Sequence, residues 1–476
     1  MKRLFCLLAL AGVALNHGCR FKDDINTDPN NPRVVQSPAT LLTSSQVGFA
    51  YAYGGAYARY AGLYTNQFSG IDRQPISLDN FNFLPSETDD AWDASYRTLL
   101  NLNALIQRSP GSPYYIGPAQ VMKALVLGTL ASNFGQVPYR TALRASEDGT
   151  GLQPTYDSGP TNYADVQALL DSGIANMAAP RSILAPGPND NLFAGDLTQW
   201  TKFAYALKAR YYMHTAKVNP GDYALAQAAA QQAAGVTARV VFPGNSVGNQ
   251  GPLYQYGTQR GDIGAGRLLT DTLRFLQDPR FVLYVTDTGG NGSNPGQADG
   301  FNASEDDFVY PNVSNPESVY FVNVSEPYFI LAEVAMRQGN TGIAASNYNT
   351  AVRASLIERG VADTVFTEFD SPEDSATKVY RRNYFRRVLV ETGSTITLNK
   401  IMVQKWLALY ANPETFADWR RTGIPATRLP DANVTGGRFV RKFPYPQKER
   451  TLNAANVPTY EPANAPQTGR VWWDVP

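Results

Sequence analysis

Apolar residues recur at three- and four-residue spacing over several long stretches of the chain, and this spacing predicts amphipathic helices. The stretches are residues 38–60, 90–108, 118–134, 161–179, 197–234, 326–358 and 399–411. Between them lie segments rich in Gly, Asn and Pro, chiefly residues 63–89, 136–160, 235–265 and 286–316. Loops of this length are uncommon unless they serve a function. The pattern predicts a mainly all-α protein with long loop-rich excursions and minor β-structure.

Two of these stretches have the spacing of tetratricopeptide-like repeats, in which small residues stand where paired helices approach and large residues fill the space between them. Residues 326–358 fit this register at Leu331, Ala332, Ala335, Gly339, Ala344, Tyr348 and Ala351. Residues 197–234 fit it at Phe203, Ala204, Leu207, Tyr223, Ala226, Ala230 and Ala233. With degenerate copies expected at 90–134 and 161–179, we predict helix pairs in a superhelical scaffold; an ordinary irregular helical domain is the alternative.

The amino terminus has the pattern of a secretory signal. Met1, Lys2 and Arg3 precede an apolar run at residues 4–15. As a helix this run spans only about 18 Å, which is too short for a bilayer core of roughly 30 Å. A short basic segment before a short apolar one is typical of a signal peptide. A buried helix that happens to come first is the alternative.

The positions of the two cysteines favour a lipid anchor. Cys6 lies inside the apolar run and would be lost with the signal, whereas Cys19 follows Gly18, the kind of small residue after which a signal peptidase cuts. Cys19 would then be the first residue and the only cysteine of the mature chain, which excludes a disulfide within it. We predict a lipoprotein signal peptide at residues 1–18, acylation of Cys19, a tether at 19–37 and one helical domain at 38–476.

The charge balance argues against a nucleic-acid partner. The chain has 41 basic and 41 acidic residues, and loss of Lys2 and Arg3 with the signal leaves a net charge of about −2. No basic excess exists to neutralise phosphates, so a nucleic-acid partner is not expected. No later segment holds 18 consecutive apolar residues, so no membrane-spanning helix is predicted.

The histidine count limits the chemistry. His17 would leave with the signal, so the mature chain keeps only His214, in a segment rich in helix formers and aromatic residues. This excludes Cys–His catalysis and any His/Cys zinc cluster. A Ser–His–Asp triad would have to use His214, for which a packing or helix-surface role is the simpler interpretation. Paired carboxylates for glycoside hydrolysis stay open.

Several segments, in order along the chain, resemble the SusD/RagB family. They read INTDPNNP at residues 25–32, NFGQVPY at 133–139, QKW at 404–406, WRRTGIP at 419–425 and VWWD at 471–474. The helical segments at 191–210 and 326–337 resemble the family too. Each block is short, and their ordered set is specific. Asn133 and Phe134 depart from the family pattern, as does the lipobox before Cys19.

The resemblance implies a tetratricopeptide-like helical scaffold whose loops form the ligand face. It also implies a nutrient-binding lipoprotein on the outer face of the outer membrane, with a SusC-like TonB-dependent transporter as partner. Lys22, Asp23 and Asp24 are similar to the corresponding export signal, although a solvated linker is the alternative. Family members bind oligosaccharides, and some bind peptides, without chemistry on the ligand. A peptide-binding member and, third, a surface glycosidase are the alternatives.

Ligand contact is expected on the loops, where aromatic faces can meet the C–H side of a sugar and planar polar groups its hydroxyls. The candidates are Asp72, Arg73, Asn80, Phe81, Phe83, Tyr256, Arg260 and Tyr310. For each aromatic, packing of its loop onto the scaffold is the alternative.

Other notable residues are assigned to the scaffold or to solvent. Core packing is predicted for Trp92, Tyr96, Trp406, Trp419 and Arg420. No catalytic residue, metal site or cofactor is predicted. The acidic run of Asp299, Glu305, Asp306 and Asp307 offers oxygen ligands for a structural calcium ion but lacks EF-hand spacing, so a solvated loop is the preferred interpretation.

Overall fold

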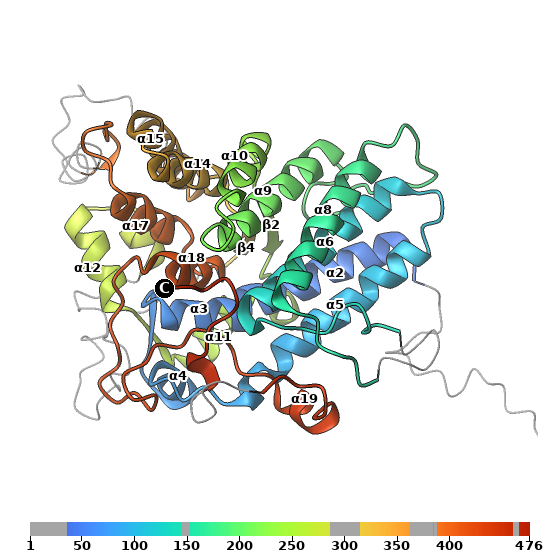
Figure 1. Ribbon diagram of the computed structural model, residues 1–476, viewed down its shortest axis with the longest axis horizontal. Helices are drawn as coiled ribbons and strands as arrows, with labels where there is room; N and C mark the ends of the chain where they lie inside the picture. Colours follow the sequence, from blue (N-terminus) through green and yellow to red (C-terminus); the bar gives the residue numbers. More distant parts are fainter. Residues whose placement is uncertain (1–35, 145–151, 286–314, 362–383, 385–387, 460–465) are drawn as a thin grey trace, which may run out of the picture. The chain divides into compact units, whose positions relative to one another are not determined.

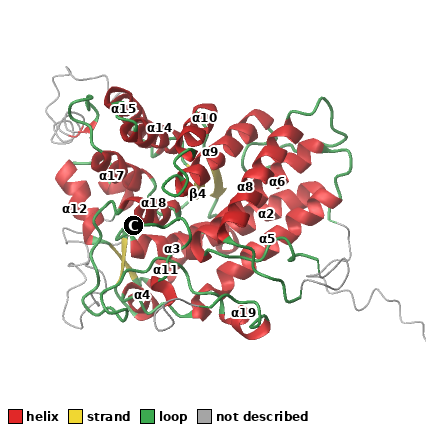
Figure 2. Ribbon diagram, in the orientation of Figure 1, coloured by secondary structure: helices red, strands yellow, loops and turns green. Residues whose placement is uncertain are grey.

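The computed structural model describes residues 36–144, 152–285, 315–361, 384, 388–459 and 466–476. The chain divides at Ser37, and the described residues from Pro38 onward belong to one compact unit, the second. The predicted signal peptide, Cys19 and almost all of the tether lie outside the described residues, as do Tyr310 and the acidic run. The second unit is built mainly from helices, which Figure 2 shows in red.

Long helices form a continuous stack in which each helix packs on a neighbour. In chain order they are α2 (Pro38–Ala52), α5 (Asp89–Gln107), α6 (Pro113–Phe134), α8 (Gly159–Met177), α9 (Leu197–Thr215), α10 (Asp222–Gln232), α14 (Glu326–Arg337), α15 (Thr341–Glu358) and α17 (Leu398–Ala408). The contacts run from α2 to α5, then through α6, α8, α9, α10 and α14 to α15 and α17. Figure 1 shows these pairs side by side, and the predicted scaffold of helix pairs is confirmed.

The residues of the repeat register lie where that register requires. Ala332, Ala344 and Ala351 are fully buried between α14 and α15. Gly339 has a φ of +77° in the turn between the two helices, a conformation that glycine adopts without strain. The small side chains let the helices approach, and Tyr348 fills the space beside them.

Shorter α-helices complete the helical part of the described chain. They are α3 (Ala58–Tyr64), α4 (Arg73–Asp79), α11 (Pro252–Arg260), α12 (Arg267–Leu276), α13 (Phe281–Tyr284), α18 (Glu414–Thr422) and α19 (Gln447–Leu452). Two of them, α4 and α11, lie in the expected loops 63–89 and 235–265. The described residues also contain four strands: β1 (Phe68–Gly70), β2 (Ala238–Phe242), β3 (Ile263–Ala265) and β4 (Glu317–Val322). Antiparallel pairing joins β1 to β3, with Phe68 opposite Ala265, and β2 to β4, with Phe242 opposite Glu317. The expected loops 63–89 and 235–265 are therefore partly regular and are held together by the β1–β3 pair.

Charged groups are buried where helices of the stack meet. Arg210 on α9 donates two hydrogen bonds of 2.7 Å to the carboxylate of Glu326 on α14. His214, also on α9, lies 2.8 Å from Glu414 and 2.8 Å from the Tyr163 hydroxyl. Burial lowers the pKa of His214, so the neutral imidazole accepts from Tyr163 and donates to Glu414. Its environment is that of a packing histidine.

The predicted scaffold residues are in the core. Trp406, Trp419 and Arg420 are buried on α17 and α18. Trp92 and Tyr96 pack together with ring centroids 4.9 Å apart, and the Tyr96 hydroxyl donates to the Pro138 carbonyl at 2.6 Å. In the part of the chain that the structure describes, no helix combines the length and apolar character that crossing a bilayer requires.

Candidate functional site

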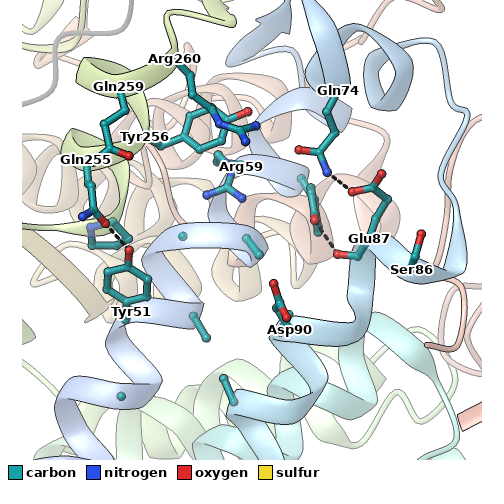
Figure 3. A pocket seen from close by; sticks show the side chains of 18 residues that line it. Tyr51, Arg59, Gln74, Ser86, Glu87, Asp90, Gln255, Tyr256, Gln259 and Arg260 are labelled. Atoms are coloured by element: carbon teal, nitrogen blue, oxygen red, sulfur yellow. Dashed lines mark hydrogen bonds between the residues drawn. The ribbon is translucent and has the colours of Figure 1, made fainter. Parts of the chain in front are cut away.

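A cavity of about 500 Å³ opens between the helix formed by α2 and α3, the start of α5, and α11. Figure 3 shows the side chains that line it. Its size lies within the range of roughly 300–1,000 Å³ that is usual for small-ligand sites. It joins residues of α2, α3 and α5 to residues of the expected loop 235–265.

The floor of this pocket is a stripe of small residues on one helix face. Gly48, Ala52, Gly55 and Ala56 line it, and their spacing of three and four residues places them together. Small side chains leave the space above the helix open. The same face carries Tyr51 at one end and Arg59 at the other.

A π-helical turn at Tyr53–Tyr57 separates α2 from α3, and the start of α11 packs against it. A Cβ on Gly54 would lie 2.5 Å from a methyl carbon of Val319, and one on Gly55 would lie 3.3 Å from the Pro252 ring. The two glycines therefore allow β4 and the start of α11 to approach the helix backbone. Such single π-turns within α-helices are often found at functional sites.

The first turn of α11 is fixed by a buried carboxylate. Glu317 on β4 accepts hydrogen bonds from the backbone N–H groups of Tyr254, at 2.7 Å, and Leu253, at 3.3 Å. Burial raises the pKa of Glu317 to about 7. These bonds satisfy free N–H groups at the helix start and hold α11 against β4.

One wall of the pocket is built around the ring of Tyr256. The Arg59 guanidinium carbon lies 4.2 Å from the ring centroid, and that of Arg260 lies 5.4 Å from it. Figure 3 shows both guanidinium groups beside this ring. Tyr51 donates a hydrogen bond to Gln255 and so links α2 to α11 across the pocket.

The opposite wall carries hydrogen-bond acceptors. Glu87 accepts a hydrogen bond from the Gln74 amide, and its backbone carbonyl accepts one of 2.7 Å from the Tyr60 hydroxyl. Asp90, in the first turn of α5, is exposed and also lines the pocket. The pocket thus places cationic donors on one side and carboxylate acceptors on the other.

The family model described as "Starch-binding associating with outer membrane", SusD-like, matches residues 29–446. The chain belongs to the SusD-like family. None of the curated proteins matches it. The fold is shared with solved structures, including a chitin-binding protein, with 23% identity, a TM-score of 0.74, and coverage of 92% of this chain and 100% of the other.

Two further relatives have the same fold. A chitin-binding SusD homolog from Flavobacterium johnsoniae has 22% identity and a TM-score of 0.73, with 91% of this chain and 98% of that one covered. A SusD/RagB family protein from Bacteroides thetaiotaomicron has 21% identity and a TM-score of 0.72, with 92% and 99% covered. The SusD/RagB resemblance of the sequence is confirmed, and it extends over nearly the whole chain.

Two of the predicted ligand contacts of this SusD-like chain, Tyr256 and Arg260, line the pocket. Arg73 lies beside them: its Nε donates to Asp262 at 2.8 Å and its Nη2 to the Arg260 carbonyl at 2.5 Å. Asp72 caps the start of α4 by accepting from the Arg73 backbone N–H at 2.8 Å. The two loops expected to form the ligand face therefore do meet, through this ion pair and the β1–β3 pair.

Three other candidates, Phe81, Phe83 and Asn80, make contacts within the fold. The expectation that Phe81 and Phe83 contact ligand needs correction. Both rings are only 3% exposed, because Phe81 packs on Tyr64 and Phe83 packs on Tyr60 and Phe443. Neither ring can offer a face to a solute. Asn80 follows the last turn of α4, and its backbone carbonyl accepts from the Val434 N–H at 3.1 Å.

Most lining residues were not among the predicted contacts, and those with large or polar side chains include Tyr51, Arg59, Gln74, Glu87 and Asp90. Tyr51 and Arg59 stand within a helix, where sequence reasoning expects scaffold. The sequence feature that could have indicated them is the four-residue spacing of Tyr51, Gly55 and Arg59. This spacing places an aromatic ring, a position without a side chain and a guanidinium group on one helix face. No cluster of three or more His, Cys, Asp or Glu side chains suited to a metal ion occurs among the described residues.

Proposed function

We propose that this chain is a surface-exposed outer-membrane lipoprotein that binds an oligosaccharide in the pocket between α2, α3, α5 and α11. It passes this nutrient to a SusC-like TonB-dependent transporter. Membership of a family described as starch-binding and outer-membrane-associated supports the proposal. So do the folds of two relatives described as chitin-binding.

The observation that carries the proposal is the combination of an exposed ring with planar polar groups in one pocket. Tyr51 is 47% exposed, whereas Tyr60 in the same lining is only 3% exposed. A sugar has an apolar C–H face that stacks on an aromatic ring and a rim of hydroxyls that both donate and accept. Arg59 and Arg260 can donate to those hydroxyls, and Glu87 and Asp90 can accept from them.

Titration calorimetry with panels of oligosaccharides and short peptides tests the ligand class. The proposal predicts saturable binding of at least one oligosaccharide and no comparable binding of peptides. Binding of peptides alone would favour the peptide-binding alternative. The same samples, analysed for products after long incubation, separate binding from hydrolysis, because cleaved glycan at enzyme-like rates would overturn the binding role.

The anchor and the transporter form the second part of the proposal. The basic and apolar residues 1–15 and the Gly18–Cys19 step support export and acylation at Cys19. In the native host, wild-type protein should fractionate with the outer membrane and co-purify with a large barrel protein. A Cys19→Ala variant should lose the membrane association; a wild-type chain always isolated alone would contradict the partnership.

A further inference from the structure

The arginine residues around Tyr256 are unequally neutralised. Arg73 pairs with Asp262 and lies 3.7 Å from Asp72, and Arg260 lies 4.0 Å from the second oxygen of Asp262. Within the described residues, no carboxylate comes within 4.0 Å of the Arg59 guanidinium. Of the three guanidinium groups, the one closest to the Tyr256 ring is thus the one without an anionic partner.

Arg59 is also the least hydrated of the three guanidinium groups, so water can replace an anionic partner least well there. Arg59 is partly buried against Tyr256. Arg73 and Arg260 are exposed, with 57% and 49% of their side-chain surface open to solvent. A partly desolvated cation gains more from an ionised acceptor than from a neutral hydroxyl, because charge-assisted hydrogen bonds are roughly twice as strong. Its forked donors match the two oxygens of a carboxylate or sulfate.

The acids of the opposite wall differ from Arg59 in this respect. Asp90 is exposed, and Glu87 already accepts a hydrogen bond from Gln74. Neither acid therefore requires a cation from the ligand, and both can accept from sugar hydroxyls. The asymmetry assigns the anionic group of a ligand to the Tyr256 wall and its hydroxyls to the α5 wall.

We infer that the pocket selects acidic oligosaccharides, whose sugar carboxylate or sulfate group binds Arg59. This inference rests on the proposed function and specifies its ligand class. Arg59 is the residue that determines specificity, and Arg260 supports it from the same wall. A neutral chain of the same backbone would bind through Tyr51 and the acids alone.

The test compares charged chains with matched neutral ones by titration calorimetry. The probes are oligogalacturonides with their methyl esters, and sulfated galactan oligosaccharides with their desulfated forms. For at least one pair, the charged chain should bind the wild type about tenfold more tightly than its neutral form. Whether that pair carries carboxylate or sulfate distinguishes the two sources of charge.

Three variants connect this preference to Arg59. Arg59→Gln should bring the ratio of the two dissociation constants close to one, whereas Arg59→Lys should keep part of it. Arg181→Gln removes an exposed arginine outside the pocket and should leave the ratio unchanged. Circular dichroism checks that each variant is folded, and Arg260→Gln, which should lower the ratio, replaces Arg59→Gln if that variant does not fold.

The outcomes separate this inference from the proposed function. If neutral chains bind as tightly as charged ones, or if Arg59→Gln keeps the charge preference, the inference is overturned while oligosaccharide binding stands. If no glycan of either kind binds, the proposed function and the inference both fall.

Discussion

Arg421 on α18 donates two hydrogen bonds of 2.8 Å to the carboxylate of Glu333 on α14, and both side chains are at most 1% exposed. The pair joins the helix stack to the segment that follows α17. Arg421 also lies 2.5 Å from Asp418, and Lys405 lies 2.7 Å from the same carboxylate. Buried ions therefore connect α14, α17 and α18 in the frame that carries the pocket.

Replacing Arg421 by methionine should strongly destabilise the protein. Removing one partner leaves Glu333 buried without its main counter-charge, which typically costs about 3–5 kcal/mol. Urea unfolding should show a loss of this size. The control is Arg140→Met, because Arg140 makes the same two-bond contact with Asp165 at 2.8 Å but its side chain is 57% exposed. That variant should lose at most about 1 kcal/mol, and equal losses would contradict a dominant role for burial.

The stability should fall as the pH drops below about 5. Burial alone would raise the pKa of Glu333, but Arg421, helped by Arg337 and Lys405, outweighs it and lowers that pKa from 4.5 to about 2. Because the native carboxylate binds a proton less readily than the unfolded one, its contribution is complete above pH 4.5 and is lost as the pH falls towards 2. The contribution is about 3 kcal/mol.

The measurement is the free energy of unfolding at pH 3, 4, 5 and 7. Glu333→Gln should flatten the slope between pH 5 and 3, whatever its effect at pH 7. The control is Asp431→Asn, which removes a carboxylate whose side chain is 90% exposed. A Glu333→Gln variant with the wild-type slope would show that other carboxylates cause the acid sensitivity.

Gly54 should be required for the close packing of β4 on the π-helical turn. An alanine Cβ would lie 2.5 Å and 2.9 Å from the two methyl carbons of Val319, so Gly54→Ala should cost about 1–3 kcal/mol by overpacking. Adding Val319→Ala should restore part of the loss, because the two changes are coupled. Gly342→Ala on α15 is the control, since nothing lies within 4 Å of its Cβ position. Two single changes whose costs simply add would argue against this contact.

The helix stack could be predicted because helical periodicity is a local property. The predicted helical stretch 326–358 corresponds to α14 and α15, with only the turn residues between them. The helix α11 could not be predicted, since the stretch is rich in Tyr, Gln and Gly and is fixed by contacts with Glu317 and the π-helical turn. The β1–β3 pair is equally non-local, because three-residue strands have no pattern of their own.

The candidate site was only partly predictable for the same reason. Tyr256 and Arg260, which line the pocket, were among the predicted contacts because aromatic and polar residues in a loop suggest ligand contact. Phe81 and Phe83 have the same local signature, yet rings from the far end of the chain, Phe439 and Phe443, cover them. Tyr51 was missed because its helix reads as scaffold, and only the fold shows that this helix face is open.

Tyr51 should contribute stacking energy to glycan binding. Tyr51→Ala should weaken the binding of an oligosaccharide roughly two- to tenfold, because aromatic contacts contribute about 0.5–1.5 kcal/mol beyond buried area. Tyr51→Phe keeps the ring but loses the hydrogen bond to Gln255, and should weaken binding less. Calorimetry on the three proteins checks this order, and a larger loss for Tyr51→Phe than for Tyr51→Ala would contradict stacking.

The most direct test of the central claim, that the pocket beside α11 holds the glycan, is a crystal structure of the complex. The crystals would contain the oligosaccharide that binds most tightly in calorimetry. The account predicts a sugar ring against Tyr51, with polar groups within hydrogen-bond distance of Arg59 and Asp90. A glycan bound elsewhere on the surface, with this pocket free of sugar, would contradict it.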